Sequence, residues 1–173
     1  MIIMTRGDSP KPKTFRHDYA TYKNVCREMG WVPKCECHKE TKKGSVAFSA
    51  YQSTTKSYKQ HETWIFDIVV VNDGNSYEKT TGIFTAPSDG TYGFAWATLT
   101  DPNKMAHPYL RVNGHYKGFT AFNNSATSQR FWSSGSNTVL FQLKKGDKVN
   151  IASGYGAAYA RERFTSFSGL KMH

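Results

Sequence analysis

The stretch FDIVVVNDGNSYEKTTGIFTAPSDGTYGFAW, residues 66–96, decides the fold of this chain. It begins within a β-branched and aromatic run, Ile65 to Val71, and such a run favours a strand that is buried on most of its surface over a helix. The run stops at residues 72–75, Asn-Asp-Gly-Asn, which tolerate positive φ or bond their own backbone. We therefore expect a core strand followed by a reversal of the chain.

A second strand is expected in the last part of that stretch. Residues 85–90, Thr-Ala-Pro-Ser-Asp-Gly, form a turn signal, and aromatic and small residues alternate after it. The rings of Tyr92, Phe94 and Trp96 point one way, while the small residues between and after them point the other. Such a strand packs rings into the core of a β-sandwich and lets another layer approach its back. Periodicity alone is also consistent with an alternative, an ordinary strand of a β-sandwich with no second layer on its back.

The spacing of the aromatic, turn and glycine residues in this stretch resembles a family signature. The residues at the signature positions are Phe66, Asn72, Tyr77, Phe84, Gly90, Tyr92, Phe94 and Trp96. Their pattern resembles that of the C1q globular domain, a trimeric head module related to tumour necrosis factor. Only Trp96 departs from it, because the family usually has Phe or Tyr there. We interpret Trp96 as a larger core ring.

Further strands follow the signature. Residues 110–112 alternate before Asn113-Gly114, a strong signal for a type I′ hairpin because both central residues of that turn need positive φ. Residues 138–151 have the pattern of two strands joined by a tight turn, and residues 164–170 that of a last strand.

These strands extend the resemblance to about residues 45–173. Residues 139–147 and 167–170 are similar to the family's penultimate hairpin and closing strand, although at Asn150 the family more often has an aromatic residue. The resemblance implies an all-β fold, a ten-stranded jelly-roll sandwich, for residues 45–173.

Residues 1–44 form a separate, basic N-terminal extension. They hold ten basic and five acidic residues, a net charge of +5 out of +10 for the whole chain, and all three cysteines. A short helix is predicted from Thr14 to Gly30, because apolar residues recur every three or four positions and Pro33 prevents continuation. Its apolar stripe would dock on the sandwich or meet its copies around a symmetry axis. Since there is no Gly-X-Y repeat and no sustained heptad repeat, we expect oligomerisation to come mainly from the globular domain.

The cysteines are Cys26, Cys35 and Cys37. In an oxidising compartment we expect one intrachain disulfide, from Cys26 to Cys35 or Cys37, which leaves one thiol for an intermolecular bond or a small partner. His38 adds a fourth soft-metal ligand, but the Cys-x-Cys-His spacing is not that of a zinc finger, and we predict no metal site. Calcium is implied by the resemblance only, and no acidic group maps onto a calcium site, so no cofactor is expected.

Short motifs add two candidate sites and argue against catalysis. Arg6-Gly7-Asp8 has the form of an integrin-binding tripeptide, and Asn123 begins an N-glycosylation signal. The sequence has no nucleophile elbow, no His-Glu-x-x-His motif, no phosphate-binding loop and no carboxylates at a catalytic spacing, so we expect no enzyme. No apolar run could cross a bilayer, and residues 1–4 are too short for the core of a signal peptide, which predicts a mature or trimmed chain.

Charge and aromatic content point to anionic or saccharide ligands. The chain has a net charge of +10, a pI near 9.5 and 14% aromatic residues, and arginines beside rings can pair with acidic groups while the rings stack on sugars. The candidates in such segments are Arg130, Trp132, Tyr155, Tyr159, Arg161 and Arg163. A second polar and aromatic group follows Trp96 and comprises Asp101, Asn103, His107 and Tyr109. The alternative is that Phe131 and Trp132 belong to the core and that the arginines form a solvated face.

The resemblance implies a secreted C1q-like protein of the short, stalkless kind, similar to the C1q-domain lectins of invertebrates such as molluscs. As a homotrimer, with higher disulfide-linked oligomers if one thiol is free, it would bind glycans or anionic microbial surface molecules in innate immune pattern recognition. Neither membrane insertion nor a nucleic-acid partner is expected. Two alternatives are an extracellular structural, adhesive or biomineral matrix protein and a signalling ligand for a protein receptor.

Overall fold

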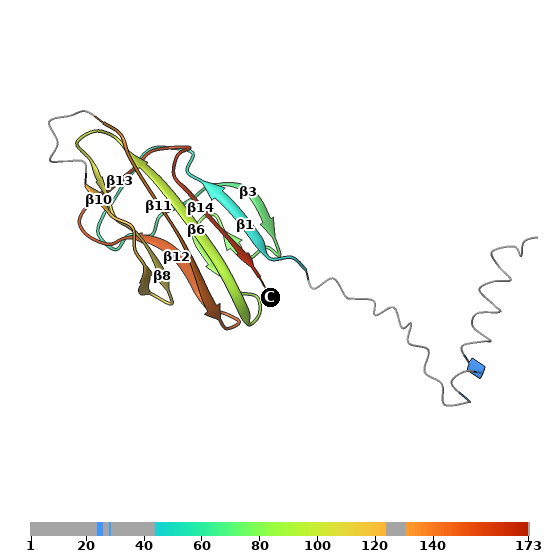
Figure 1. The fold of residues 1–173 in the computed structure, drawn as a ribbon. Coiled ribbons are helices and arrows are strands. Elements are labelled where there is room, and N and C mark those ends of the chain that lie inside the picture. The colour runs from blue at the N-terminus through green and yellow to red at the C-terminus, as the bar shows by residue number, and fades with distance from the viewer. Residues whose placement is uncertain (1–23, 26–27, 29–43, 124–130, 173) are drawn as a thin grey trace, which may run out of the picture. The chain divides into compact units, whose positions relative to one another are not determined.

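The computed structural model of the protein describes residues 24–25, 28, 44–123 and 131–172 (Figure 1). The chain divides into two compact units, Met1–Lys42 and Lys43–His173, and the strands among the described residues all lie in the second. The predicted disulfides, the integrin-type tripeptide and nearly all of the predicted helix fall outside the described residues.

Ten strands form two antiparallel sheets of five (Figure 1). The first sheet has the order β11-β6-β14-β1-β3, with β1 (Ala47–Tyr51), β3 (Ile68–Asp73), β6 (Gly90–Thr100), β11 (Ser133–Leu143) and β14 (Ser166–Lys171). The second has the order β4-β5-β12-β8-β9, with β4 (Tyr77–Glu78), β5 (Ile83–Thr85), β8 (Pro108–Val112), β9 (His115–Gly118) and β12 (Lys148–Ser153). Two small pairs join β2 (Lys56–Tyr58) to β13 (Ala158–Ala160) and β7 (Met105–Ala106) to β10 (Phe122–Asn123). The all-β, ten-stranded jelly-roll prediction is confirmed.

The core between the two sheets is built mainly of aromatic rings. In β6 the rings of Tyr92, Phe94 and Trp96 are buried, as their alternation predicts. Phe167 from β14 lies at the centre of the ring cluster, and its centroid is 4.9 Å from that of Phe48 and 6.0 Å from that of Phe94. Such edge-to-face and offset contacts add to the free energy gained from burial alone.

A glycine makes room for these rings. Gly169 pairs with Phe48 on one side and Phe94 on the other, and a Cβ atom at this position would lie 2.6 Å from both rings. No other residue fits there unless the rings move, because such a distance is far inside van der Waals contact.

The predicted turns have the expected backbone. Gly74 and Asn75 have φ values of 81° and 48° between β3 and β4. Asn113 and Gly114, with φ values of 50° and 81°, join β8 to β9 in the predicted hairpin.

Two predictions about strand placement are wrong. Residues 68–73 form β3, which lies at the edge of its sheet and leaves Val70 and Val71 exposed instead of buried, because within the described part of the chain β3 pairs with β1 alone. Residues 138–151 do not form a hairpin either. The turn at residues 144–147 carries the chain across the sandwich, so that β11 pairs with β6 in one sheet and β12 pairs with β5 and β8 in the other.

The ring core can be tested by truncating its central member. We expect Phe167→Ala to lower the free energy of unfolding by about 3–5 kcal/mol, because it leaves a cavity among four other rings. Phe164→Ala is the matched control; its ring is exposed, and we expect a change within about 0.5 kcal/mol. Chemical denaturation at equal protein concentration measures both, and equal losses would contradict the packing described.

Candidate ligand-binding site

Three chain segments bring polar and aromatic side chains together at one end of the sandwich. Asp101 and Lys104 follow β6, Trp132 precedes β11, and Tyr159 and Arg161 lie in and after β13. The register explains the convergence, because the end of β6 pairs with the start of β11 and the Arg161 backbone N–H donates to the Leu99 carbonyl at 2.9 Å. We call Asp101, Lys104, Trp132, Tyr159 and Arg161 the loop-end cluster.

Direct contacts hold the loop-end cluster together. Arg161 Nη1 donates to Asp101 Oδ1 at 2.6 Å, and the Tyr159 hydroxyl donates to Asp101 Oδ2 at 2.8 Å. The Arg161 guanidinium also lies over the Trp132 ring, 4.3 Å from its centroid, and Lys104 Nζ lies 5.5 Å from the centroid of Tyr159. Both are cation–π arrangements.

The charges of the loop-end cluster stabilise one another. Burial opposes ionisation of Asp101, but the hydrogen bonds from Arg161 and Tyr159 outweigh it and lower the pKa of this carboxyl. The same hydrogen bond raises the pKa of Arg161, and burial together with the bond to Asp101 raises the pKa of Tyr159. The cluster therefore presents an ionised carboxylate and a guanidinium side by side at neutral pH.

A groove of about 360 Å³ adjoins the loop-end cluster. Its walls come from residues 103–105 on one side and from residues 156–159 on the other, with Ser57 beside them. Asn103 stands at its rim with a φ of 61°, a conformation that Asn tolerates better than most residues. The ring of Trp132 is 52% exposed, so the site offers a donor, an acceptor and an aromatic surface together.

Five of the ten ligand candidates named from the sequence meet at this place: Asp101, Asn103, Trp132, Tyr159 and Arg161. The alternative that Phe131 and Trp132 belong to the core is wrong, because both rings are exposed. Arg163 is also exposed, and its backbone N–H donates to the Gln52 carbonyl, away from these contacts. Arg130 lies outside the described residues.

The other three candidates lie together elsewhere. His107, Tyr109 and Tyr155 form ring contacts with centroid distances of 5.8–6.5 Å, and Tyr109 also meets Tyr116 and Phe119. We call these five residues the aromatic patch.

Sequence reasoning missed Lys104, Tyr116 and Phe119. Tyr116 could have been predicted from the hairpin at Asn113-Gly114. That hairpin pairs Tyr116 with Arg111, and Arg111 is two residues from Tyr109 on β8. Phe119 follows the end of β9, where no periodicity constrains a side chain.

Within the described part of the chain, no group of three or more His, Cys, Asp or Glu side chains is placed to hold a metal ion. Among the same residues, no helix is long and apolar enough to span a membrane. The glycosylation signal at Asn123 continues into residues that the structure does not describe.

A ten-stranded antiparallel jelly roll is the fold of the C1q and tumour necrosis factor class. The C1q domain family matches residues 47–171, and the chain belongs to this family. The match to the solved globular domain of zebrafish complement 1qA protein covers 75% of this chain and 98% of the zebrafish chain, with a TM-score of 0.59 at 18% identity. The match to the solved structure of Eiger TNF from S. frugiperda covers 76% of this chain and 94% of the Eiger chain, with a TM-score of 0.57 at 13% identity.

Curated relatives give the same family. Complement C1q tumor necrosis factor-related protein 3 of Homo sapiens is 32% identical over 130 residues, which are 73% of this chain and 51% of the relative. The protein of that name from Mus musculus has the same identity and coverage. The chain thus spans about half the length of these relatives.

The pKa of Asp101 provides a test of the loop-end cluster. By NMR titration we expect this pKa to lie below its ordinary value near 3.8 and to move upward in Arg161→Gln, which removes the charged donor. Because the pKa is lower in the folded state, Asp101 contributes stability that is fully present above its ordinary pKa and is lost as the pH falls through the folded pKa. An unchanged pKa in Arg161→Gln would show that the ion pair does not form in solution.

Proposed function

We propose that this protein is an extracellular, non-catalytic recognition protein whose C1q head forms a homotrimer and binds saccharides through the loop-end cluster. The observation that carries the proposal is the Asp101 carboxylate, held between Tyr159 and Arg161, beside the exposed ring of Trp132. The extracellular setting is what membership of the C1q family implies.

The chemistry of the cluster suits sugar hydroxyls. A hydroxyl both donates and accepts, and Asp101 offers acceptor oxygens while Arg161 offers guanidinium donors. The free part of the Trp132 ring can pack against the apolar C–H face of a pyranose. Asp101 offsets the charge of Arg161 locally, so this pair suits the paired hydroxyls of a sugar. The net charge of +10 acts over a longer range and draws the protein towards anionic surfaces.

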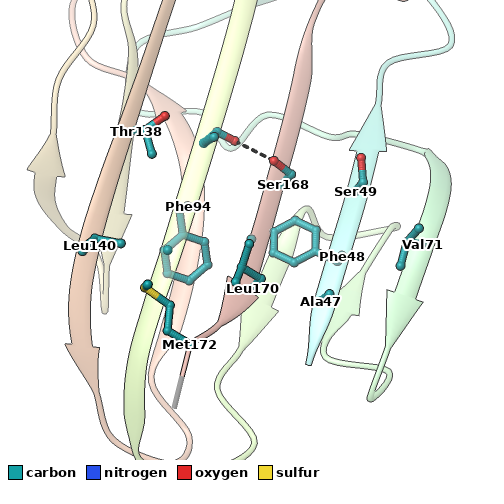
Figure 2. Close-up of a pocket in the computed structure, with 13 residues that line it drawn as sticks. Ala47, Phe48, Ser49, Val71, Phe94, Thr138, Leu140, Ser168, Leu170 and Met172 are labelled. Carbon is teal, nitrogen blue, oxygen red and sulfur yellow. Dashed lines mark hydrogen bonds between the residues drawn. The ribbon is translucent and has the colours of Figure 1, made fainter. Parts of the chain in front are cut away.

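The support for a homotrimer is an apolar face on the outer side of the first sheet, shown in Figure 2. Gly93 on β6 lies between Leu140 on β11 and Leu170 on β14, and these residues line a shallow cavity of about 380 Å³ with Ala47 and Met172. Leu140 is 60% exposed in the single chain. A large exposed apolar patch with a small-residue floor is typical of a protein interface. In a symmetric trimer, the apolar face of each of the three chains would be buried against a neighbouring chain.

Trimerisation also supports the recognition function. One loop-end cluster per chain offers few contacts, so each site would bind weakly. Three sites held in fixed geometry bind repeated glycans with an avidity that exceeds the single-site affinity by orders of magnitude.

A second candidate function, a signalling ligand for a protein receptor, is favoured by one observation. The 32% identity extends to relatives whose name includes tumor necrosis factor-related protein. The two functions differ in the ligand class of the end loops, and glycan arrays separate them.

The trimer is tested by placing a charge in the apolar face. We expect wild-type protein to have the mass of three chains by light scattering on a size-exclusion column and Leu140→Glu to have the mass of one, because the carboxylate would be buried without a partner. Thr85→Glu, which adds the same charge to an exposed position of the second sheet, should remain a trimer. A monomeric wild type would refute the proposal of a trimer.

Saccharide binding is tested by glycan arrays and bacterial-surface pull-downs with the folded oligomer. We expect binding to weaken at least about tenfold in Trp132→Ala and Arg161→Gln, which remove the stacking ring and the donor. Lys148→Gln removes an equal charge from the second sheet and should bind like the wild type. Blank arrays and blank pull-downs for the wild type would refute the proposed function.

A further inference from the structure

The aromatic patch is a feature that core packing does not explain. Tyr109 is only 8% exposed and meets four rings edge to face, at centroid distances of 4.9–6.5 Å. Two of those rings, Phe119 and Tyr155, expose 57% and 63% of their surface. Both exposed rings pack against the same buried ring, and exposed apolar side chains grouped in this way mark binding sites.

The patch is held in a fixed geometry. The backbone N–H of Gly154 donates to the His107 carbonyl at 2.8 Å, and the Tyr116 hydroxyl donates to the Ser153 carbonyl at 3.0 Å. Gly154 lies so close to Tyr109 that a Cβ atom would be 2.1 Å from the ring. The rings of Tyr109 and Tyr116 are fixed in this way, so the base of the patch need not rearrange when a ligand binds.

The aromatic patch and the loop-end cluster share two chain segments. Residues 101–109 bear Lys104 of the cluster and Tyr109 of the patch, and residues 154–161 bear Tyr155 of the patch and Arg161 of the cluster. The groove of about 360 Å³ lies between these segments, because residues 103–105 and 156–159 form its walls.

The distance between the two sites is limited by the chain itself. Tyr155 and Tyr159 are four residues apart, and four residues extend over at most about 14 Å of backbone. The groove begins at Gly156, the residue next to Tyr155, and ends at Tyr159 of the loop-end cluster, so the two sites lie within the length of a short chain of sugars.

We propose that the loop-end cluster, the groove and the aromatic patch form one extended site for a saccharide chain of several pyranose units. This inference rests on the proposed function. One unit of the chain binds Asp101 and Arg161 through its hydroxyls, and units further along stack their C–H faces on Tyr155 and Phe119. The ligand class follows from this alternation, because a saccharide chain carries hydroxyl pairs and apolar ring faces along its whole length.

Calorimetry with sugars of increasing length tests the extended site. The probes are the mono-, di- and tetrasaccharides of mannose and of galacturonic acid, a neutral and an acidic series. For at least one series we expect the tetrasaccharide to bind about tenfold or more tightly than the monosaccharide. The double variant Phe119→Ala/Tyr155→Ala should remove this advantage and leave monosaccharide binding unchanged. Tyr155→Phe keeps the ring and should bind the tetrasaccharide like the wild type.

The outcomes separate this inference from the proposed function. Equal affinity for all lengths, or an undiminished length advantage in the double variant, would overturn the extended site while leaving the loop-end cluster as a terminal-sugar site. No binding by either series would also overturn the extended site as proposed, whereas saccharide recognition itself would be overturned only by blank glycan arrays together with blank bacterial-surface pull-downs. The double variant changes exposed rings, and an unchanged melting temperature would show that it folds.

Discussion

The interlocked rings between the two sheets are the constraint on which the rest of the molecule depends. Phe48 from β1 and Phe94 from β6 meet Phe84 of the second sheet at centroid distances of 5.3 Å. Phe167 from β14 meets Tyr77 of the second sheet at 6.3 Å. These contacts set the separation of the two layers. The rings need Gly169, because any side chain there would collide with Phe48 and Phe94. The inner positions of β6 carry large rings and its outer positions Gly93 and Ala95 are small, so the same strand supplies both the core and the floor of the apolar face.

The rigid sandwich explains how residues far apart in the sequence form one cluster. Asp101 and Arg161 are 60 residues apart, yet their side chains meet at 2.6 Å because β6 and β13 end at the same edge. Trp132 joins them because β11 starts beside the end of β6. Side chains positioned by strand ends are well suited to recognition, since the loops can vary while the sheets hold them in place.

The sequence predicts those features of the fold that depend on local chemistry. The inward rings of β6 follow from a period of two, and the turns at Gly74 and at Asn113-Gly114 follow from residues that accept positive φ. Strand partners do not follow in this way. A β-branched run such as residues 68–71 has the same pattern in a central strand and at an edge, and a tight turn at residues 144–147 can close a hairpin or cross between sheets. These choices depend on contacts between residues that are distant in sequence.

The candidate site could be predicted only in part, because its contacts also join residues that are distant in sequence. Arginines next to aromatic residues indicated Trp132, Tyr159 and Arg161, but only the fold shows that Asp101 pairs with Arg161 and that Tyr155 belongs to a separate patch.

Hydrogen exchange with and without the mannose and galacturonic acid tetrasaccharides tests most directly whether the loop-end cluster and the aromatic patch bind one saccharide chain. A bound tetrasaccharide should slow exchange in residues 101–109 and 154–161 and leave the β4–β5 turn unchanged. Binding accompanied by protection confined to other segments would contradict recognition at this end of the sandwich.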